Sequence, residues 1–185
     1  MSVADSLAVM SVADYLPWEE SQPTRHELVG GRAYAMSGGS ERHGLMSAFL
    51  FSLVASGAYA AGCRPFSEGR KLRVAAGDLY YPDLLVVCGP AGNDLYETDA
   101  TFVVEVLSPS TRSIDRREKL RGYQTLPSIQ AYAMVEPDVR RIEVARWTAD
   151  EVAWVAYGDG DIFDVPYATW SVDSIYETID SMATF

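Results

Sequence analysis

The sequence predicts an α+β fold in which helices and mostly antiparallel strands form one domain. A long segment with apolar residues at helical spacing is followed by two strongly apolar, β-prone runs and then by further alternating runs. The chain has 185 residues, a length that suits a single domain with a sizeable core. Because no repeat, low-complexity tract or linker divides the chain, we expect residues 1–185 to form one domain.

The N-terminal part of the sequence predicts two helices with a hairpin between them. In chain order these elements are a short helix over 11–20, a hairpin over 26–36 and a long helix over 41–61. Gly30 and Gly31 supply the hairpin turn, since glycine adopts the positive φ that tight turns require. Ser40 can cap the long helix, whose broad apolar stripe indicates that it is well buried.

The rest of the chain predicts strands, one middle helix and a closing helix. We expect an extended run over 64–74, strands over 79–88, 101–107, 131–135, 140–147 and 152–157, and helices over 113–125 and 171–182. The runs at 79–88 and 101–107 are nearly continuously hydrophobic, which is typical of central strands covered on both faces. The last two strands have the spacing of a hairpin.

The charge distribution argues against nonspecific binding to polyanions. The chain carries a formal net charge of −11, and every charged residue from 148 to 185 is acidic. Affinity for nucleic-acid phosphates grows with the number of cations presented, so a strongly acidic protein binds them poorly over a broad surface. Two locally basic stretches, 64–73 and 112–121, are compatible either with a basic rim around a site or with ordinary solvated surface.

Composition also predicts the compartment. Cys63 and Cys88 are too few for a disulfide framework, which favours a reducing, cytoplasmic location. Near the start of the sequence, Asp5 stands where a secretory signal would have lysine or arginine, so we expect no secretory signal. We found no run of about 18 uncharged apolar residues and therefore expect no membrane span.

Two acidic residues stand inside the two most hydrophobic runs of the chain. Asp83 follows Pro82 in the first run, and Glu105 lies between Val104 and Val106 in the second. An ionised carboxylate is costly to bury without a partner, and two of them on neighbouring strands would raise a pKa or require a divalent cation. Oxygen ligands that include one or two carboxylates suit Mg²⁺. The structural alternative is that Asp83 is a turn residue and Glu105 pairs with an arginine.

The chain contains only two lysines, and either one is a candidate partner for these acids. Lys119 lies in the helix predicted after the Glu105 strand, with Asp115 and Tyr123 one turn away on the same face. Such a lysine could return to the carboxylates and stabilise a phosphate, or it could form a surface pair with Asp115. Lys71, on the preceding strand, is the other candidate.

These segments together resemble the Uma2 family, bacterial proteins described as restriction endonucleases of the PD-(D/E)xK nuclease superfamily. The residues that carry the resemblance are Tyr81 to Val87, Phe102 to Thr111, Asp115, Lys119 and Tyr123, with further matches at His26 to Gly31, His43 and Tyr132 to Pro137. The resemblance covers residues 12–180, nearly the whole chain. The combination of segments is specific, whereas Pro-Asp alone would not be.

The resemblance implies a restriction-endonuclease-like fold, a central mixed sheet flanked by helices, and a site for Mg²⁺ or Mn²⁺. It implies that Asp83 and Glu105 are metal ligands, with the backbone carbonyl of Val106 as a third, and that Glu27 is an accessory acid. The usual lysine two residues after the glutamate is replaced here by Leu107, and Lys119 is the displaced substitute.

The function implied is hydrolysis of DNA phosphodiester bonds by metal-activated water, with Asp83, Glu105 and Lys119 as the catalytic residues. A homodimer is expected, because cutting two strands often uses two sites. The alternative function is a catalytically inactive nuclease-fold protein that binds nucleic acid or a protein partner. Leu107 and the acidic C-terminal segment motivate that alternative.

Overall fold

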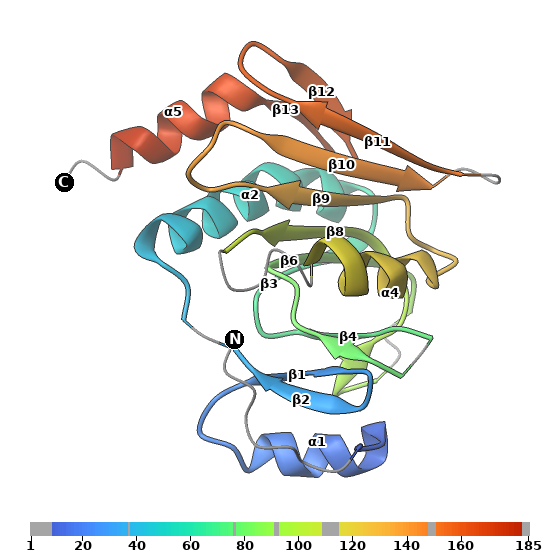
Figure 1. Ribbon diagram of the computed structural model, residues 1–185. Helices are drawn as coiled ribbons and strands as arrows, with labels where there is room; N and C mark the ends of the chain where they lie inside the picture. Colours follow the sequence, from blue (N-terminus) through green and yellow to red (C-terminus); the bar gives the residue numbers. More distant parts are fainter. Residues whose placement is uncertain are drawn as a thin grey trace.

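A mixed six-stranded sheet lies at the centre of the protein (Figure 1). The computed structural model describes residues 9–36, 38–75, 77–90, 93–108, 115–147 and 151–182. Across this sheet the strands are β11 (Val152–Tyr157), β10 (Ile142–Trp147), β9 (Ala131–Val135), β8 (Ala100–Val106), β6 (Leu84–Cys88) and β3 (Cys63–Ser67). Neighbouring strands are antiparallel except β8 and β9, which are parallel. The predicted α+β class is therefore confirmed.

A smaller sheet, covered by α1 (Val12–Glu20), lies at one end of the molecule (Figure 1). Its strands, in spatial order, are β2 (Arg32–Ala35), β1 (His26–Val29), β5 (Leu79–Tyr80), β4 (Lys71–Arg73) and β7 (Tyr96–Glu97). Tyr15 of α1 packs on Leu28 and Leu79, and its hydroxyl donates to the backbone carbonyl of His26. Side chains of this smaller sheet pack in one hydrophobic cluster with side chains of the central sheet. Strand β1 is therefore held close to the central sheet.

One face of the central sheet is covered by α2 (Glu41–Ala60), α5 (Val172–Met182) and the hairpin of β12 (Ile162–Val165) and β13 (Ala168–Ser171). The long helix buries Met46, Leu50 and Val54 against the sheet, as its apolar stripe predicted. Gly57 is required where α2 meets the hairpin, because an added Cβ would lie 2.0 Å from the backbone oxygen of Tyr167.

The other face is covered by a π-helical turn, η1 (Asp115–Lys119), which continues into α4 (Leu120–Gln124). Tyr123 packs there with Tyr80 of the smaller sheet and Tyr132 of β9. Val103 and Leu85 point to this face, whereas Val104 and Leu84 point to the α2 face. Alternation along β8 therefore directs Glu105 towards α4 and the smaller sheet.

Most of the predicted elements are present, including the Ser40 cap of the long helix and both hairpins. Ser11 and Ser40 cap α1 and α2 with their side chains, and β10 pairs with β11. The predicted helix over 113–125 is described from Asp115 onwards, and Ser113 lies outside the described residues.

Two predicted strands are wrong, because each is divided between the two sheets. The run over 64–74 is broken by a turn in which Glu68 and Gly69 have φ of 42° and 76°, values outside the strand region. The run over 79–88 is broken at Tyr81, Pro82 and Asp83, so Asp83 directly precedes β6 and does not lie inside a strand. The sequence analysis also missed β7, β12 and β13, which have only two to four residues and are too short to show a periodic pattern.

The expectation of no membrane span stays a prediction, because one helix passes a test of length and composition. Residues 41–60 form one helix that is long and apolar enough to cross a membrane, although the core helix of a protein passes the same test. Here the helix packs on the central sheet through its buried side chains.

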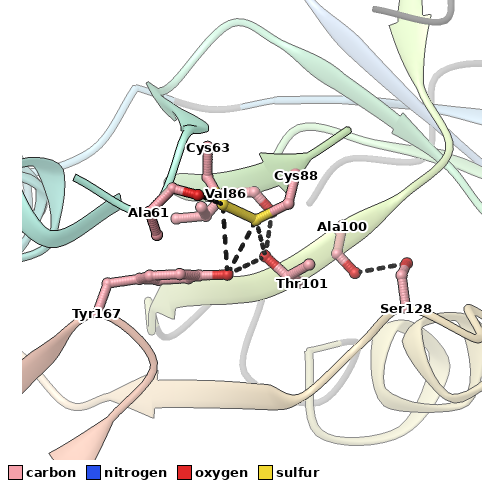
Figure 2. The surroundings of a disulfide bond; sticks show 8 residues. All are labelled: Ala61, Cys63, Val86, Cys88, Ala100, Thr101, Ser128 and Tyr167. Atoms are coloured by element: carbon pink, nitrogen blue, oxygen red, sulfur yellow. Dashed lines mark hydrogen bonds between the residues drawn. A yellow bond between two sulfur atoms is a disulfide. The ribbon is translucent and has the colours of Figure 1, made fainter. Parts of the chain in front are cut away.

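Cys63 and Cys88 face each other on β3 and β6 and form a disulfide (Figure 2). The hydroxyl of Tyr167 lies 3.1 Å from Cys88 Sγ and 2.8 Å from the hydroxyl of Thr101. The disulfide therefore joins the edge strand β3 to its neighbour β6. It lies at the opposite end of β6 from Asp83. Disulfides are typical of oxidising compartments, and the cytoplasmic location stays a prediction.

Candidate active site

Asp83 and Glu105 come together where β6 begins and β8 ends. Leu84 pairs with Val104 across the two strands, so the next position along the antiparallel pair sets Asp83 opposite Glu105. Asp83 Oδ2 accepts a hydrogen bond of 2.7 Å from the backbone nitrogen of Val106. The two acids are therefore neighbours on adjoining strands, as the sequence analysis expected for acids within its two most apolar runs. Among the described residues, no arginine is hydrogen-bonded to the carboxylate of Asp83 or Glu105.

Lys119 is buried among three carboxylates. Its Nζ atom lies 2.9 Å from Glu27 Oε1, 3.0 Å from Glu105 Oε1 and 3.2 Å from Asp115 Oδ1. The three acids come from different parts of the chain, β1, β8 and η1. Lys119 is only 3 % exposed, so the alternative of a surface pair with Asp115 is wrong, although the pair itself forms. We call Lys119, Glu27, Glu105 and Asp115 the lysine cluster.

Asp115 and Lys119 both face inwards from η1. Residues four apart lie on one face of a helix, and in η1 both of these side chains are buried while Arg117 and Glu118 are exposed. Tyr132 from β9 donates a hydrogen bond of 3.2 Å to the backbone oxygen of Asp115 and so supports the start of the turn.

The lysine cluster holds more negative than positive charge. Burial lowers the pKa of Lys119, but Glu105, Glu27 and Asp115 outweigh this and raise the pKa well above its usual value. Burial raises the pKa of Glu105 well above its usual value; Lys119 opposes this, whereas Asp115, Asp83 and Glu27 add to it. The ammonium therefore stays charged, and Glu105 gains from a further proton or cation nearby.

Two further groups fix these acids in place. Tyr123 donates its hydroxyl hydrogen to Glu105 Oε1 at 2.7 Å, and burial together with Glu105 raises the pKa of Tyr123 well above its usual value. Glu27 Oε1 accepts from the backbone nitrogen of Tyr81 at 2.9 Å. Because Tyr81 lies two residues before Asp83, this bond ties Glu27 to the segment that positions Asp83.

His43 is a site residue whose chemical role the sequence analysis missed. Its Nε2 atom lies 2.9 Å from the Val106 carbonyl oxygen and 3.5 Å from Asp83 Oδ2. Gly39 makes room for the ring, since an added Cβ would lie 2.8 Å from His43 Nδ1. The hydrogen bond to Asp83 raises the pKa of His43 despite burial. The available signal was its position in the first turn of the long helix, among the residues that carry the family resemblance.

The other sequence-predicted residues lie elsewhere or serve the core. Lys71 pairs with Glu19 at 2.9 Å and does not contact the described site carboxylates. Leu107, at the position where a lysine was expected, is buried in the apolar core. Pro109, Ser110 and Thr111, which contribute to the family resemblance, lie outside the described residues.

The donor set of Asp83, Glu105 and the Val106 carbonyl contains oxygen only. The described residues include no group of three His, Cys, Asp or Glu side chains arranged to hold a metal ion. Mg²⁺ accepts one or two carboxylates and keeps several waters, and Mn²⁺ takes the same ligand types. A divalent cation would also balance the excess negative charge beside Lys119. The residues present therefore fit Mg²⁺ or Mn²⁺ better than zinc, which favours histidine and cysteine.

A cavity of about 470 Å³ lies beside Asp83 and His43. It is bounded by the start of α2, the turn after β3 and the segment before β6. Its volume is within the range of about 300–1,000 Å³ that is usual for ligand sites. The candidate site is therefore accessible to a ligand from the Asp83 side, whereas the lysine cluster is enclosed.

Comparison with known proteins gives one family, whose model carries the description "Putative restriction endonuclease" and matches residues 12–172. Two relatives are uncharacterized proteins of Synechocystis sp. (strain ATCC 27184 / PCC 6803 / Kazusa). One is 36 % identical over 129 residues, 68 % of each chain. The other is 25 % identical over 148 residues, 77 % of this chain and 84 % of the relative.

A solved structure shares the fold. It is the crystal structure of "a putative nuclease belonging to DUF820" from Anabaena variabilis ATCC 29413. The match has a TM-score of 0.77 at 16 % identity and covers 92 % of this chain and 99 % of that chain. With the family model matching most of the sequence, the chain belongs to the Uma2 family.

Proposed function

We propose that the protein is a Mg²⁺- or Mn²⁺-dependent endonuclease that hydrolyses phosphodiester bonds of DNA. The strongest support is that Asp83 and Glu105 lie together at adjoining strand ends, and that the buried Lys119 forms an ion pair with Glu105. Burying these charges carries a desolvation penalty that opposes folding. Groups of this kind are concentrated at functional sites. The family description supports the same class of reaction.

In this proposal Asp83, Glu105 and the Val106 carbonyl hold the divalent cation. When bound, such a cation would supply an activated water and stabilise charge on a phosphate oxygen. Lys119 holds a permanent positive charge 3.0 Å from Glu105, where it can stabilise negative charge that develops on the phosphate. Glu27, Asp115 and Tyr123 act as positioning residues, because they fix Lys119 and Glu105.

The second candidate is a nuclease-fold protein that binds without cutting. It is favoured by Leu107 at the position of the usual lysine, and by the three carboxylates that already occupy Lys119. In this case Lys119 would be a structural counter-ion for the acids, and loss of Asp83 would leave DNA binding intact.

A nicking assay on supercoiled plasmid, with Mg²⁺ or Mn²⁺, distinguishes the two candidates. Asp83→Asn and Glu105→Gln are expected to lower the nicking rate at least about a hundredfold, as loss of one group that stabilises the transition state does. Glu97→Gln is the matched control, because Glu97 is a comparably buried strand acid that is paired with Arg64 and Arg70 instead of Lys119. Equal nicking by both site variants and the parent protein would contradict the proposal.

Titration calorimetry with Mn²⁺ gives a second, independent readout. The endonuclease proposal expects heat of binding that is lost in Asp83→Asn and kept in Glu97→Gln. The predicted homodimer is checked in the same preparations by sedimentation, and the predicted cytoplasmic location by fractionation of cells that express the protein.

A further inference from the structure

In the described part of the chain, strand β11 is an edge of the central sheet with no strand on its outer side. It pairs with β10 alone, and β12 and β13 form a separate two-stranded sheet (Figure 1). The register of β11 on β10 runs without a bulge from Val152 to Tyr157. The outer side of β11 therefore presents a regular row of backbone N–H and C=O groups that a further strand can pair with.

The side chains of β11 are apolar and partly open to solvent. Its six residues carry no charge, and no proline interrupts them. Trp154 is 42 % exposed and Val155 is 41 % exposed. Because successive side chains of a strand point to opposite faces of the sheet, apolar surface lies on both faces beside this edge. A strand added to β11 would therefore bury apolar surface on each face.

The opposite edge of the same sheet, β3, is protected in ways that β11 lacks. Pro65, in the middle of β3, has no N–H group to donate. Arg64, beside it, is charged and pairs with Glu97 at 3.2 Å. Proline and charge are devices by which proteins prevent pairing at sheet edges. β11 contains neither device, so its outer side is open to pairing with another chain.

A second copy of this chain fits the edge as an antiparallel partner. Most homo-oligomers are symmetric, and a two-fold axis sets the same surface of each copy against the other. In an antiparallel pair, the N–H and C=O groups of two opposite residues point either towards each other or away from each other. Because these directions alternate along a strand, the two-fold axis must pass through a residue and not between two residues.

The acids beside β11 select the residue on the axis. An axis at Trp154 or at Val155 pairs most of β11, whereas an axis nearer either end pairs fewer of its residues. With the axis at Val155, Glu151 would face Asp159, and like charges directly opposite each other destabilise a strand pair. With the axis at Trp154, Glu151 faces Tyr157 and the two Trp154 side chains meet. Aromatic cross-strand pairs are stabilising, so the axis at Trp154 is favoured.

We propose that two copies of this chain associate through β11, antiparallel across a two-fold axis at Trp154, so that their central sheets join into one. β11 itself carries no acid, so nothing within the strand selects a basic partner instead. The inference gives the homodimer expected from the sequence a defined surface. It does not depend on the proposed endonuclease activity, because its tests need neither DNA nor divalent metal.

Sedimentation of the whole protein at low and high NaCl concentration tests the association. Every charged residue from 148 to 185 is acidic, so the two copies repel each other around the strand, and salt that screens this repulsion should lower the dissociation constant of the dimer. A basic partner on the same edge would be released by salt. A protein that stays monomeric at about 100 μM in high salt would overturn the inference, as would a dimer that salt dissociates.

Trp154→Lys tests the contact itself. It replaces the aromatic pair on the axis by two like charges, and we expect it to weaken dimerisation at least tenfold. Tyr59→Lys is the matched control, because Tyr59 is an aromatic residue of α2 that is 62 % exposed, and it is expected to dimerise like the parent protein. Thermal unfolding checks that both variants are folded. Equal dimerisation by the two variants would overturn the inference.

Cysteine substitution tests the position of the axis. Trp154→Cys sets a thiol opposite its own copy, within the reach of a disulfide, and mild oxidation is expected to give a covalent dimer that a reducing gel separates. Cys63 and Cys88 are bonded to each other and supply no free thiol. Tyr59→Cys is the control and is expected to give at least tenfold less covalent dimer. Equal yields from the two variants would overturn the proposed axis.

Discussion

Two groups of buried charges in this protein differ in how their charges balance. Glu97 is 2 % exposed and is held by two arginines, with Arg70 at 2.7 Å and Arg64 at 3.2 Å. In the lysine cluster one ammonium is shared by three acids. In the Glu97 group two cations neutralise one acid, as in a structural ion pair. The lysine cluster leaves acid unsatisfied, which is typical of sites that bind a cation or move a proton.

Loss of the central cation is expected to have the largest effect on stability. Lys119→Met leaves the three acids of the lysine cluster without a cation and should lower the free energy of unfolding by about 3–5 kcal/mol, the usual cost of breaking a buried ion pair. Mg²⁺ should restore part of this loss. Urea unfolding with and without Mg²⁺ measures both effects.

Arg64→Met is the matched control, since Glu97 keeps Arg70 as a partner. We expect a loss of about 1–2 kcal/mol, near the lower end of the contribution of hydrogen bonds to a charged group, and no response to Mg²⁺. Equal losses in the two variants would contradict the difference between the two groups.

A third buried group, around Glu143, gives a pH-dependent prediction. Burial raises the pKa of Glu143, but hydrogen bonds from Arg116 and Arg141 outweigh this and lower the pKa below its usual value. A lowered pKa in the folded state stabilises the protein above the unfolded-state value, and the gain is lost as the pH falls through the folded-state pKa. Glu143→Gln should therefore cost about 1–2 kcal/mol at pH 7, and the difference should shrink below about pH 4.5.

Thermal unfolding of parent and variant in a series of buffers measures that difference. A constant gap between them from neutral to acidic pH would show that packing rather than charge accounts for the loss.

The hydroxyl of Tyr123 is expected to matter more for activity than for stability. Tyr123→Phe removes the donor to Glu105 and should cost about 1 kcal/mol of stability, while it lowers the nicking rate about tenfold. Tyr176→Phe is the matched control, because that buried tyrosine of α5 donates to the backbone oxygen of Glu136 instead of a site acid. Equal nicking by the two variants would remove Tyr123 from the positioning residues.

The smallest effect on stability is expected from neutralising Glu105. Because burial, and after it the surrounding acids, already disfavour the charge of Glu105, Glu105→Gln should change the free energy of unfolding by less than about 1 kcal/mol. Glu97→Gln should cost about 1.5–3 kcal/mol, the range for hydrogen bonds to a charged group. Urea unfolding in EDTA compares the two, and a larger loss in Glu105→Gln would reverse the comparison.

The sequence predicted the candidate site better than it predicted the strands around it. Two acids within apolar runs can be recognised as unusual from a single sequence, because charged side chains are rarely buried. The strand boundaries at Glu68 and Pro82 depend on which of two sheets each half of a run joins, and local pattern carries no information about that choice. Glu27 was assigned by resemblance alone, since a short hairpin strand does not reveal that it reaches Lys119. His43 needed the tertiary structure to show its contact with Val106.

The wide π-helical turn of η1 also sets how the protein tolerates changes in chain length. Each residue of an α-helix advances the side-chain direction by about 100°, and π-helical turns behave as helices with one residue more per turn. Deleting a single residue there, such as the exposed Glu118, would let the segment wind as an ordinary helix, in which three steps turn the side chain nearly as far as four steps of the wider turn. The ammonium would therefore keep nearly its direction towards β8, and the outer surface of η1 should tolerate a one-residue deletion better than an ordinary helix does.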